Sequence, residues 1–328
     1  MVIPMILLEK VRNFMESRII LTGAELDIFT RIHRGLNTAE AIAEENRLDI
    51  RALTRLLDAL VVYGFLEKAN STYQLTSDGL LFSSDHPEST LPMVLHMNEL
   101  WDTWSHLTES VVQGKNPARA PRSQKSEKAA NAFIGAMHVV GRRLSQQIAN
   151  SLDLSPYQRL LDIGGASGTY TIAFLNKNPD LKSVIFDLKQ VIPLAEAGIR
   201  EAGLADRVEL VSGDFYTDEL PKGCDLALLS AIIHQNSPAQ NLALYEKIYR
   251  ALAPGGTLLI RDHIMEDNRT RPPAGAIFAL NMLVGTEGGD TYTFQEVKSA
   301  LESAGFSDIR QIQQGENMDC IVTARKFA

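Results

Sequence analysis

The stretch Leu160-Leu-Asp-Ile-Gly-Gly-Ala-Ser-Gly168 decides the fold, because an apolar run ends in Asp162 and a turn with three glycines follows. A second apolar run, Val184-Ile-Phe-Asp187, also ends in an acid, and Val208-Glu-Leu-Val211 precedes Asp214. In doubly wound α/β proteins the glycine turn after the first strand lies against the cofactor, and an acid after the second binds ribose hydroxyls. Three acids at three successive strand ends therefore predict a Rossmann-like doubly wound sheet that holds a ribose-bearing cofactor.

The glycine turn does not match the motifs that bind phosphate groups. Ala166 stands where the second glycine of G-x-G-x-x-G would let a pyrophosphate approach, and the chain has no G-x-x-x-x-G-K-[ST] loop. Acidic residues would repel phosphates, but they suit a cationic sulfonium and an α-amino group. On these residues the pattern resembles the class I S-adenosylmethionine methyltransferases. The resemblance implies S-adenosylmethionine as cofactor and S-adenosylhomocysteine as product.

The resemblance also assigns parts of the cofactor to parts of the sequence. In such enzymes the first turn approaches the methionine part, the second acid binds the ribose, and the third acidic segment flanks the adenine. Ser230 stands where some relatives carry a lysine or arginine near the adenine. The cofactor-binding set implied in this way is Asp162, Gly164, Gly165, Asp187, Leu188, Gly213, Asp214, Phe215 and Ser230. The alternative, that these are ordinary turn residues, is disfavoured by the order and spacing of the three segments.

Length and composition narrow the class of protein further. The chain has 328 residues, enough for two domains of about 100–200 residues each, and its net charge of −8 argues against a nucleic acid or an anionic membrane as partner. Cys224 and Cys320 are the only cysteines, so no disulfide framework and no metal-ligand spacing is implied. The apolar start is interrupted by Glu9 and Lys10 and lacks the basic segment of a signal peptide. We therefore expect a cytoplasmic protein that holds no metal and does not enter a membrane.

The N-terminal half has helical periodicity, followed by a compact pattern of two helices and a hairpin. Helices are predicted over 39–45 and 50–63, and a small hairpin over 65–75. This is the order of a winged helix, whose second helix could enter the major groove of DNA. Residues 1–100, however, contain nine Lys and Arg against fourteen Asp and Glu, and a net charge of about −5 has the wrong sign for binding phosphates. A role in dimerisation fits better.

Further segments narrow the resemblance to one family. The segments that carry it are Ala24-Glu-Leu-Asp-Ile-Phe29, Tyr73-Gln-Leu-Thr-Ser-Asp-Gly79, Trp101-Asp-Thr-Trp-Ser-His-Leu107 and Phe133-Ile-Gly-Ala-Met137. They are similar to the O-methyltransferases typified by plant caffeate and bacterial antibiotic-pathway enzymes, and the resemblance covers nearly the whole chain. It implies a homodimer whose N-terminal domains interlock and help to close the partner's substrate pocket. The expected domains are a winged-helix dimerisation and lid domain over 1–155 and an α/β S-adenosylmethionine-binding domain over 156–328.

A histidine follows the longest apolar run of the C-terminal half. Residues 225–233 predict a buried strand, and His234 comes directly after it. Ligands of open α/β sheets lie beyond the carboxyl ends of the strands, so this imidazole should face the cofactor. A phenol with a pKa of about 10 is mostly protonated at neutral pH, and an imidazole titrating near pH ~6.5 is a suitable base for it. In the family this histidine is the general base; the alternative is a histidine that belongs to the core.

The sequence around His234 departs from the family. The usual His-Asp-Trp reads His234-Gln-Asn236, which puts the contacts behind the base in doubt. Asp262 and Asp290 match two acidic positions of the family, where many relatives carry Glu. A carboxylate bonded to one ring nitrogen fixes the tautomer and leaves the other nitrogen free to accept a proton. The predicted catalytic set is therefore His234 with Asp262 or Asp290, and His263 is a secondary candidate for the base.

Apolar and aromatic residues occupy the segments where family members line the acceptor pocket. Such side chains suit a flat apolar acceptor, but at helical spacing the same residues are often part of a core. The substrate-binding set is Met97, Trp101, Phe133, Met137, Phe278, Asn281 and Met282, with Met93 and Trp104 in the same segments.

Together these features predict O-methylation of a hydroxyl on a small aromatic or related secondary metabolite. Two alternatives stay open. The altered motif after His234 is compatible with C-methylation, or with hydroxylation or decarboxylation on the same scaffold. A winged-helix regulator that senses a metabolite is opposed by the acidic N-terminal half. The shape of the pocket, which no motif encodes, decides which acceptor is bound and which atom is methylated.

Overall fold

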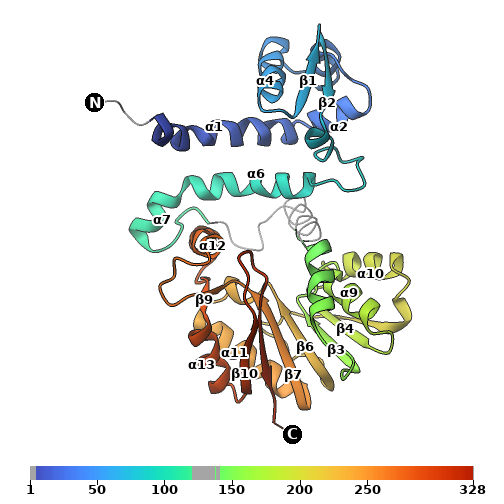
Figure 1. Ribbon diagram of the computed structural model, residues 1–328, viewed down its shortest axis with the longest axis vertical. Helices are drawn as coiled ribbons and strands as arrows, with labels where there is room; N and C mark the ends of the chain where they lie inside the picture. The colour runs from blue at the N-terminus through green and yellow to red at the C-terminus, as the bar shows by residue number, and fades with distance from the viewer. Residues whose placement is uncertain (1–4, 120–136, 138–140, 328) are drawn as a thin grey trace. The chain divides into compact units, whose positions relative to one another are not determined.

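The computed structural model describes residues 5–119, 137 and 141–327 (Figure 1). The chain forms two compact units, one of Met1–Asp102 with Arg122–Val139 and the other of Thr103–Pro121 with Val140–Ala328. The domain boundary at residue 155 stays a prediction. None of the helices in the described ranges combines the length and the hydropathy that a membrane span requires.

The first unit consists of helices and a two-stranded hairpin. Its elements are α1 (Met5–Glu25), α2 (Ile28–His33), α3 (Ala39–Asn46), α4 (Ile50–Val62), β1 (Leu66–Ala69), β2 (Thr72–Leu75), α5 (Ser77–Leu80) and most of α6 (Leu91–Ser105). Thr38 caps α3 and Asp49 caps α4, each through a side-chain oxygen that accepts a backbone N–H of the first turn. Gly64, with φ +79°, leads from α4 into the hairpin. The predicted order of two helices and a hairpin is therefore confirmed.

Apolar packing joins the hairpin to the helices of this unit. Phe29 of α2, Leu57 of α4 and Leu66 of β1 are buried in one core cluster. Tyr73 of β2 enters the same cluster, and its hydroxyl donates to the carboxylate of Asp58 on α4 at 2.8 Å. The buried ring and its satisfied hydroxyl fix the hairpin against α4.

The second unit is built on a seven-stranded sheet with the order β10-β11-β7-β6-β3-β4-β5. Its strands are β3 (Arg159–Ile163), β4 (Lys182–Asp187), β5 (Val208–Ser212), β6 (Cys224–Ser230), β7 (Leu252–Asp262), β10 (Ser307–Gln313) and β11 (Cys320–Arg325), and β8 (Ile264–Met265) pairs separately with β9 (Tyr292–Thr293). Its helices are α7 (Leu107–Gln113), α9 (Thr169–Lys177), α10 (Ile192–Glu201), η2 (Ala205–Arg207), η3 (Ile233–Gln235), α11 (Pro238–Ala251), α12 (Pro273–Gly285) and α13 (Phe294–Ser303), and residues 141–151 are also helical.

The strand order is that of a doubly wound fold. Strands β3 to β7 run parallel, and β11 runs antiparallel to both β7 and β10. The order of the strands reverses between β3 and β6, which are neighbours in the sheet. This reversal is the topological switch point, beside which open α/β sheets bind their ligands. The predicted class I methyltransferase sheet is confirmed.

Helices cover both faces of this sheet (Figure 1). Leu229 and Ile260 point to one face and pack with residues of α11 and α13, whereas Leu228 and Leu259 point to the other and pack with α9 and α10. Neighbouring residues of a strand point to opposite faces, so a strand covered on both faces reads as a continuous apolar run. The long apolar run before His234 is therefore explained by a strand that is covered by helices on both faces.

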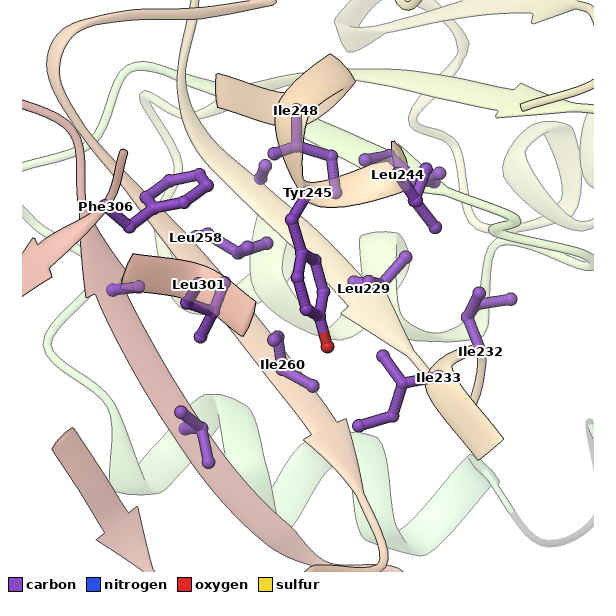
Figure 2. Close-up of a cluster of buried hydrophobic side chains, with 14 of the residues drawn as sticks. Leu229, Ile232, Ile233, Leu244, Tyr245, Ile248, Leu258, Ile260, Leu301 and Phe306 are labelled. Carbon is purple, nitrogen blue, oxygen red and sulfur yellow. The ribbon is translucent and has the colours of Figure 1, made fainter. Parts of the chain in front are cut away.

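One of the two cores continues up to the carboxyl end of β6. Figure 2 shows Tyr245 of α11 extending from its helix into this cluster, in which Leu229 and Ile260 are also drawn. Ile232 and Ile233, at the end of the same cluster, directly precede His234. The backbone that leads to the histidine is therefore held by buried apolar side chains.

A buried acid connects β3 to α9. Asp162 is 2% exposed and accepts the hydroxyl of Thr171 at 2.7 Å. Burial raises the pKa of Asp162 to about 6, against the effect of the Thr171 hydrogen bond and together with the charge of Asp187. The carboxyl group of Asp162 therefore supports the start of α9, but its buried surroundings oppose its ionisation.

We expect Asp162→Asn to change the pH dependence of stability. Between the unfolded pKa of about 3.9 and the folded value of about 6, the folded chain keeps a proton that the unfolded chain has released. As the pH rises from about 4.5 to about 7 the wild type should therefore lose stability relative to the variant, by roughly 2 kcal/mol. Urea denaturation of both proteins at about pH 4.5 and about pH 7 measures this difference. The same free-energy difference at both pH values would contradict it.

Candidate active site

The segments predicted to bind the cofactor meet at the carboxyl ends of β3, β4 and β5. Gly164 follows β3, Asp187 ends β4, and Gly213 follows β5. The N–H of Gly164 donates to the carbonyl of Phe186 at 2.8 Å. The N–H of Gly213 donates to the carbonyl of Asp187 at 2.9 Å. Main-chain hydrogen bonds therefore bring the three segments together beside the switch point of the sheet.

Close packing explains two glycines of the first turn. Gly164 has φ +70°, and a Cβ there would lie 2.8 Å from Cδ1 of Ile232. A Cβ on Gly165 would lie 2.9 Å from the carboxylate of Asp162. Larger side chains do not fit at either position, so glycine is what lets the turn pack against Ile232 and Asp162.

The second acid, Asp187, is held by main-chain donors. Its Oδ2 accepts the N–H of Ala166 at 2.8 Å, and its Oδ1 accepts the N–H of Leu188 at 2.7 Å. A carboxylate has about four lone-pair sites, so both oxygens can also accept the hydroxyls of a ribose. The acceptor oxygens at the tip of β4 therefore suit the two hydroxyls of a ribose.

The loop after β5 is held by a lysine that no motif indicated. Nζ of Lys247 on α11 donates to the carbonyls of Phe215, Tyr216 and Asp218 at 2.9–3.0 Å. Within the loop, Asp214 accepts the N–H of Tyr216 at 2.9 Å. Charge-assisted bonds to three carbonyls fix the loop in the place where the adenine is predicted. Sequence reasoning missed Lys247 because only the tertiary fold brings α11 to this loop.

Two further cofactor residues predicted from the sequence, Ser230 and Asp162, also have side chains bonded within the protein. Ser230 Oγ accepts Nε–H of Arg261 at 2.8 Å. Asp162 lies beneath Gly165 and accepts from Thr171. Asp162 therefore supports the turn from below, and direct contact of either residue with the cofactor stays a prediction.

His234 lies in η3, and its ring is bound by Asp262 at the end of β7. Nδ1 of His234 is 2.9 Å from Oδ1 and 3.0 Å from Oδ2 of Asp262. The side chain of Asp262 is fully buried, and that of His234 is 12% exposed. Burial acts to raise the pKa of Asp262, but His234, the charge of Arg261 and the N–H of His263 outweigh it, so the pKa lies below its ordinary value. An ionised Asp262 favours the tautomer that carries its proton on Nδ1, in which Nε2 can accept a proton.

A buried polar network occupies the place of the family's usual Asp-Trp. Asn236 is fully buried, and its Oδ1 accepts the hydroxyl of Tyr216 at 2.5 Å. Its Nδ2 donates to Asn241 at 3.0 Å, and its carbonyl accepts the hydroxyl of Tyr292. Asn241 donates in turn to the carbonyl just before His234 at 2.9 Å. These bonds fix the backbone on both sides of His234.

The other predicted acid, Asp290, contacts His234 only through the main chain. Its N–H donates to the carbonyl of His234 at 2.9 Å. Its carboxylate accepts the N–H of Thr291 and lies 3.5 Å from the guanidinium of Arg269. Of the two acids left open by the sequence, Asp262 is thus the one bonded to the imidazole.

The secondary base candidate, His263, is a buried acceptor. It is 5% exposed, and its Nδ1 accepts the N–H of Met318 at 3.1 Å. Burial lowers the pKa of His263 to about 4, so its ring is neutral at physiological pH. Phe278 of α12 packs against both histidines, with ring centroids 4.9 Å from His234 and 5.0 Å from His263.

The predicted acceptor residues are distributed over both units. In the second unit, Nε1 of Trp104 donates to Oδ1 of Asn281 at 2.9 Å, and Met282 is buried on the same helix, α12. Phe133 lies outside the described residues. The first unit holds Met93, Met97, Trp101 and Met137.

The strand order, the glycine turn and the acid at the end of β4 define a class I methyltransferase. Residues 104–307 match the O-methyltransferase domain family, and residues 8–85 match the O-methyltransferase dimerisation domain. The chain belongs to this O-methyltransferase family, whose cofactor is S-adenosylmethionine.

Relatives match along nearly the whole chain. The chain is 29% identical over 314 residues to the tetracenomycin polyketide synthesis 8-O-methyl transferase TcmO of Streptomyces glaucescens, covering 93% of this chain and 91% of that protein. It is 28% identical over 318 residues to the 3-hydroxy-5-methyl-1-naphthoate 3-O-methyltransferase of Streptomyces sahachiroi, covering 94% and 91%. The solved structure of the mitomycin 7-O-methyltransferase MmcR is 25% identical, with a TM-score of 0.86 and coverage of 98% and 96%.

We expect Asp187→Ala to weaken the binding of S-adenosylhomocysteine. The loss of charge-assisted bonds to the ribose hydroxyls should lower the affinity by about 10- to 100-fold. Calorimetric titration of the wild type and the variant measures the effect. Asp180→Ala is the matched control, because Asp180 is exposed before the amino end of the same strand. Equal affinities of the Asp187 variant and the wild type would argue against the assigned ribose site.

Proposed function

We propose that this chain methylates a hydroxyl group of a small aromatic acceptor, with His234 as the general base and Asp262 as the residue that positions it. The buried hydrogen bond between these two side chains carries the proposal. The names of two relatives specify a naphthoate 3-hydroxyl and a polyketide 8-hydroxyl as the groups methylated, which supports an aromatic acceptor.

Methylation of a hydroxyl group requires one proton transfer, from the hydroxyl to a base. S-adenosylmethionine, when bound, would supply the methyl group: its carbon–sulfur bond would break as a nucleophile in line with that bond attacks, and S-adenosylhomocysteine would leave. Nε2 of His234 accepts the proton of the acceptor hydroxyl as the new oxygen–carbon bond forms. Asp262 keeps the proton on Nδ1 and stabilises the resulting imidazolium, which then releases its extra proton to solvent.

One face of α12 fits the acceptor. Phe278, Asn281 and Met282 are spaced at i, i+3 and i+4, so they share a face of the helix. Phe278 lies edge-on to the ring of His234. Phe278 beside the imidazole, with an amide and a thioether on the same face of its helix, suits a flat acceptor with a polar substituent.

Substitution of the two catalytic residues should lower turnover and leave cofactor binding intact. We expect His234→Gln to reduce kcat by about 100- to 10,000-fold, the usual contribution of a general base. Asp262→Asn should reduce kcat to a smaller extent, since the base remains but its preferred tautomer is lost. A labelled-methyl assay with a panel of hydroxylated aromatics measures turnover, and calorimetry with S-adenosylhomocysteine measures binding.

Asp290→Asn separates the two acids that the sequence left open. Its carboxylate lies against Arg269 instead of the imidazole, so this variant should keep most of its turnover. A loss in Asp290→Asn as large as that in Asp262→Asn would contradict the assignment of Asp262. Full activity of His234→Gln would remove the histidine from the mechanism.

The apolar surface of α1 supports a homodimer. Leu8, Val11 and Met15 recur at helical spacing, and with Phe14 they are 40–71% exposed in the single chain. Helix α1 lies within the segment that matches the dimerisation domain. A second copy of this chain is the proposed occupant, because exposed apolar side chains of this number gain free energy when they are buried.

We expect Val11→Glu with Phe14→Glu to convert the dimer to a monomer, because two charges would be buried without partners. Analytical ultracentrifugation measures the change. Val62→Glu, at an 81% exposed apolar position of α4, is the control and should stay dimeric. A wild-type chain that sediments as a monomer would contradict the proposal.

A further inference from the structure

A buried arginine lies at the carboxyl edge of the sheet, on the face opposite Asp262. Arg261 is 5% exposed and pairs in register with Ser230, the last residue of β6. Its Nε donates to Ser230 Oγ at 2.8 Å, and one terminal nitrogen donates to the carbonyl of Met318 at 2.9 Å. The other terminal nitrogen lies 3.8 Å from the sulfur of Met318, a weak acceptor.

In the described part of the chain this guanidinium touches no carboxylate directly, although the charge of Asp262 is near enough to interact with it. Arginine stays protonated in proteins, and a buried charge is stable only when it is paired or fully hydrogen-bonded. Within the described ranges, none of the ion pairs contains Arg261. Asp262, the next residue, binds His234 and the N–H of His263 with its oxygens. The buried guanidinium of Arg261 therefore keeps N–H groups that can donate to a further acceptor.

A second buried polar group faces the same guanidinium. The ring of Tyr170 lies 5.0 Å from Cζ of Arg261. The hydroxyl of Tyr170 is buried, and no described residue meets it with hydrogen-bond geometry, although Ser230 and Arg261 lie close enough to act on its pKa. Tyr170 is the second residue of α9, directly after the glycine turn that the family places against the methionine part of the cofactor.

We propose that Arg261, Ser230 and Tyr170 form a carboxylate-binding site at this end of the sheet. The carboxylate is that of the methionine part of the cofactor or one carried by the acceptor. A planar carboxylate can accept from a guanidinium and from the Tyr170 hydroxyl at once, which would pair the charge and satisfy both groups. The site deepens the proposed function and rests on it.

Ligands that differ by one carboxylate test this site without an activity assay. Calorimetry would compare S-adenosylhomocysteine with 5′-methylthioadenosine, which lacks the amino-acid part, on the wild type, Arg261→Met and Arg261→Lys. Protein saturated with S-adenosylhomocysteine would then be titrated with 3-hydroxy-2-naphthoate and with its methyl ester. Arg207→Met is the matched control, because that guanidinium binds carbonyls of Leu175 and Leu181 away from the site.

If the cofactor supplies the carboxylate, Arg261→Met should bind S-adenosylhomocysteine about 10- to 100-fold more weakly and 5′-methylthioadenosine unchanged. If the acceptor supplies the carboxylate, Arg261→Met should bind only the naphthoate more weakly, and its affinity for the methyl ester should be unchanged. In either case Arg261→Lys, which keeps the charge, should lose less affinity than Arg261→Met. Should Arg261→Met fail to fold, Tyr170→Phe provides the same comparison.

Unchanged affinities of the Arg261 variants for all four ligands would overturn the proposal. So would equal weakening of S-adenosylhomocysteine and 5′-methylthioadenosine, which would show a general effect on the fold. A wild type that binds neither nucleoside would contradict the proposed function itself, which distinguishes the two failures.

Discussion

The hydrogen bond between Nδ1 of His234 and the carboxylate of Asp262 is the interaction on which the site depends. It exists because β6 and β7 are parallel neighbours, so their carboxyl ends deliver both residues to one edge of the sheet. The apolar cluster that contains Ile233 fixes the chain before the histidine, and the bonds of Asn236 fix it afterwards. An imidazole held in this way would need little rearrangement to act as the proposed base when the acceptor arrives.

The cofactor side of the site follows from the same sheet geometry. Main-chain bonds tie the glycine turn and the loop after β5 to the end of β4, and Asp187 is oriented by two backbone N–H groups. Asp162 supports the turn from below, where burial raises its pKa to about 6. Stability is therefore given up at neutral pH for a rigid turn, a common compromise where a fold presents backbone to a ligand.

The sequence was sufficient to predict those residues that a local sequence pattern marks. The glycine turn, Asp187 and His234 each follow an apolar strand, and the period of the strands with the rules of doubly wound sheets places such residues at one edge. Asn236, Lys247 and Arg261 escaped prediction because their partners come from distant elements. The choice between Asp262 and Asp290 required the three-dimensional structure for the same reason, because both match a motif but only Asp262 bonds the imidazole of His234.

The tautomer of His234 tests the central claim most directly. Nitrogen-15 NMR of histidine-labelled protein, with His234→Gln to assign the signals, reports which ring nitrogen carries the proton. A neutral ring held by Asp262 should show the proton on Nδ1, and Asp262→Asn should shift the population toward the other tautomer. A proton on Nε2 in the wild type at neutral pH would contradict the account, because that nitrogen could then not accept the proton of a hydroxyl.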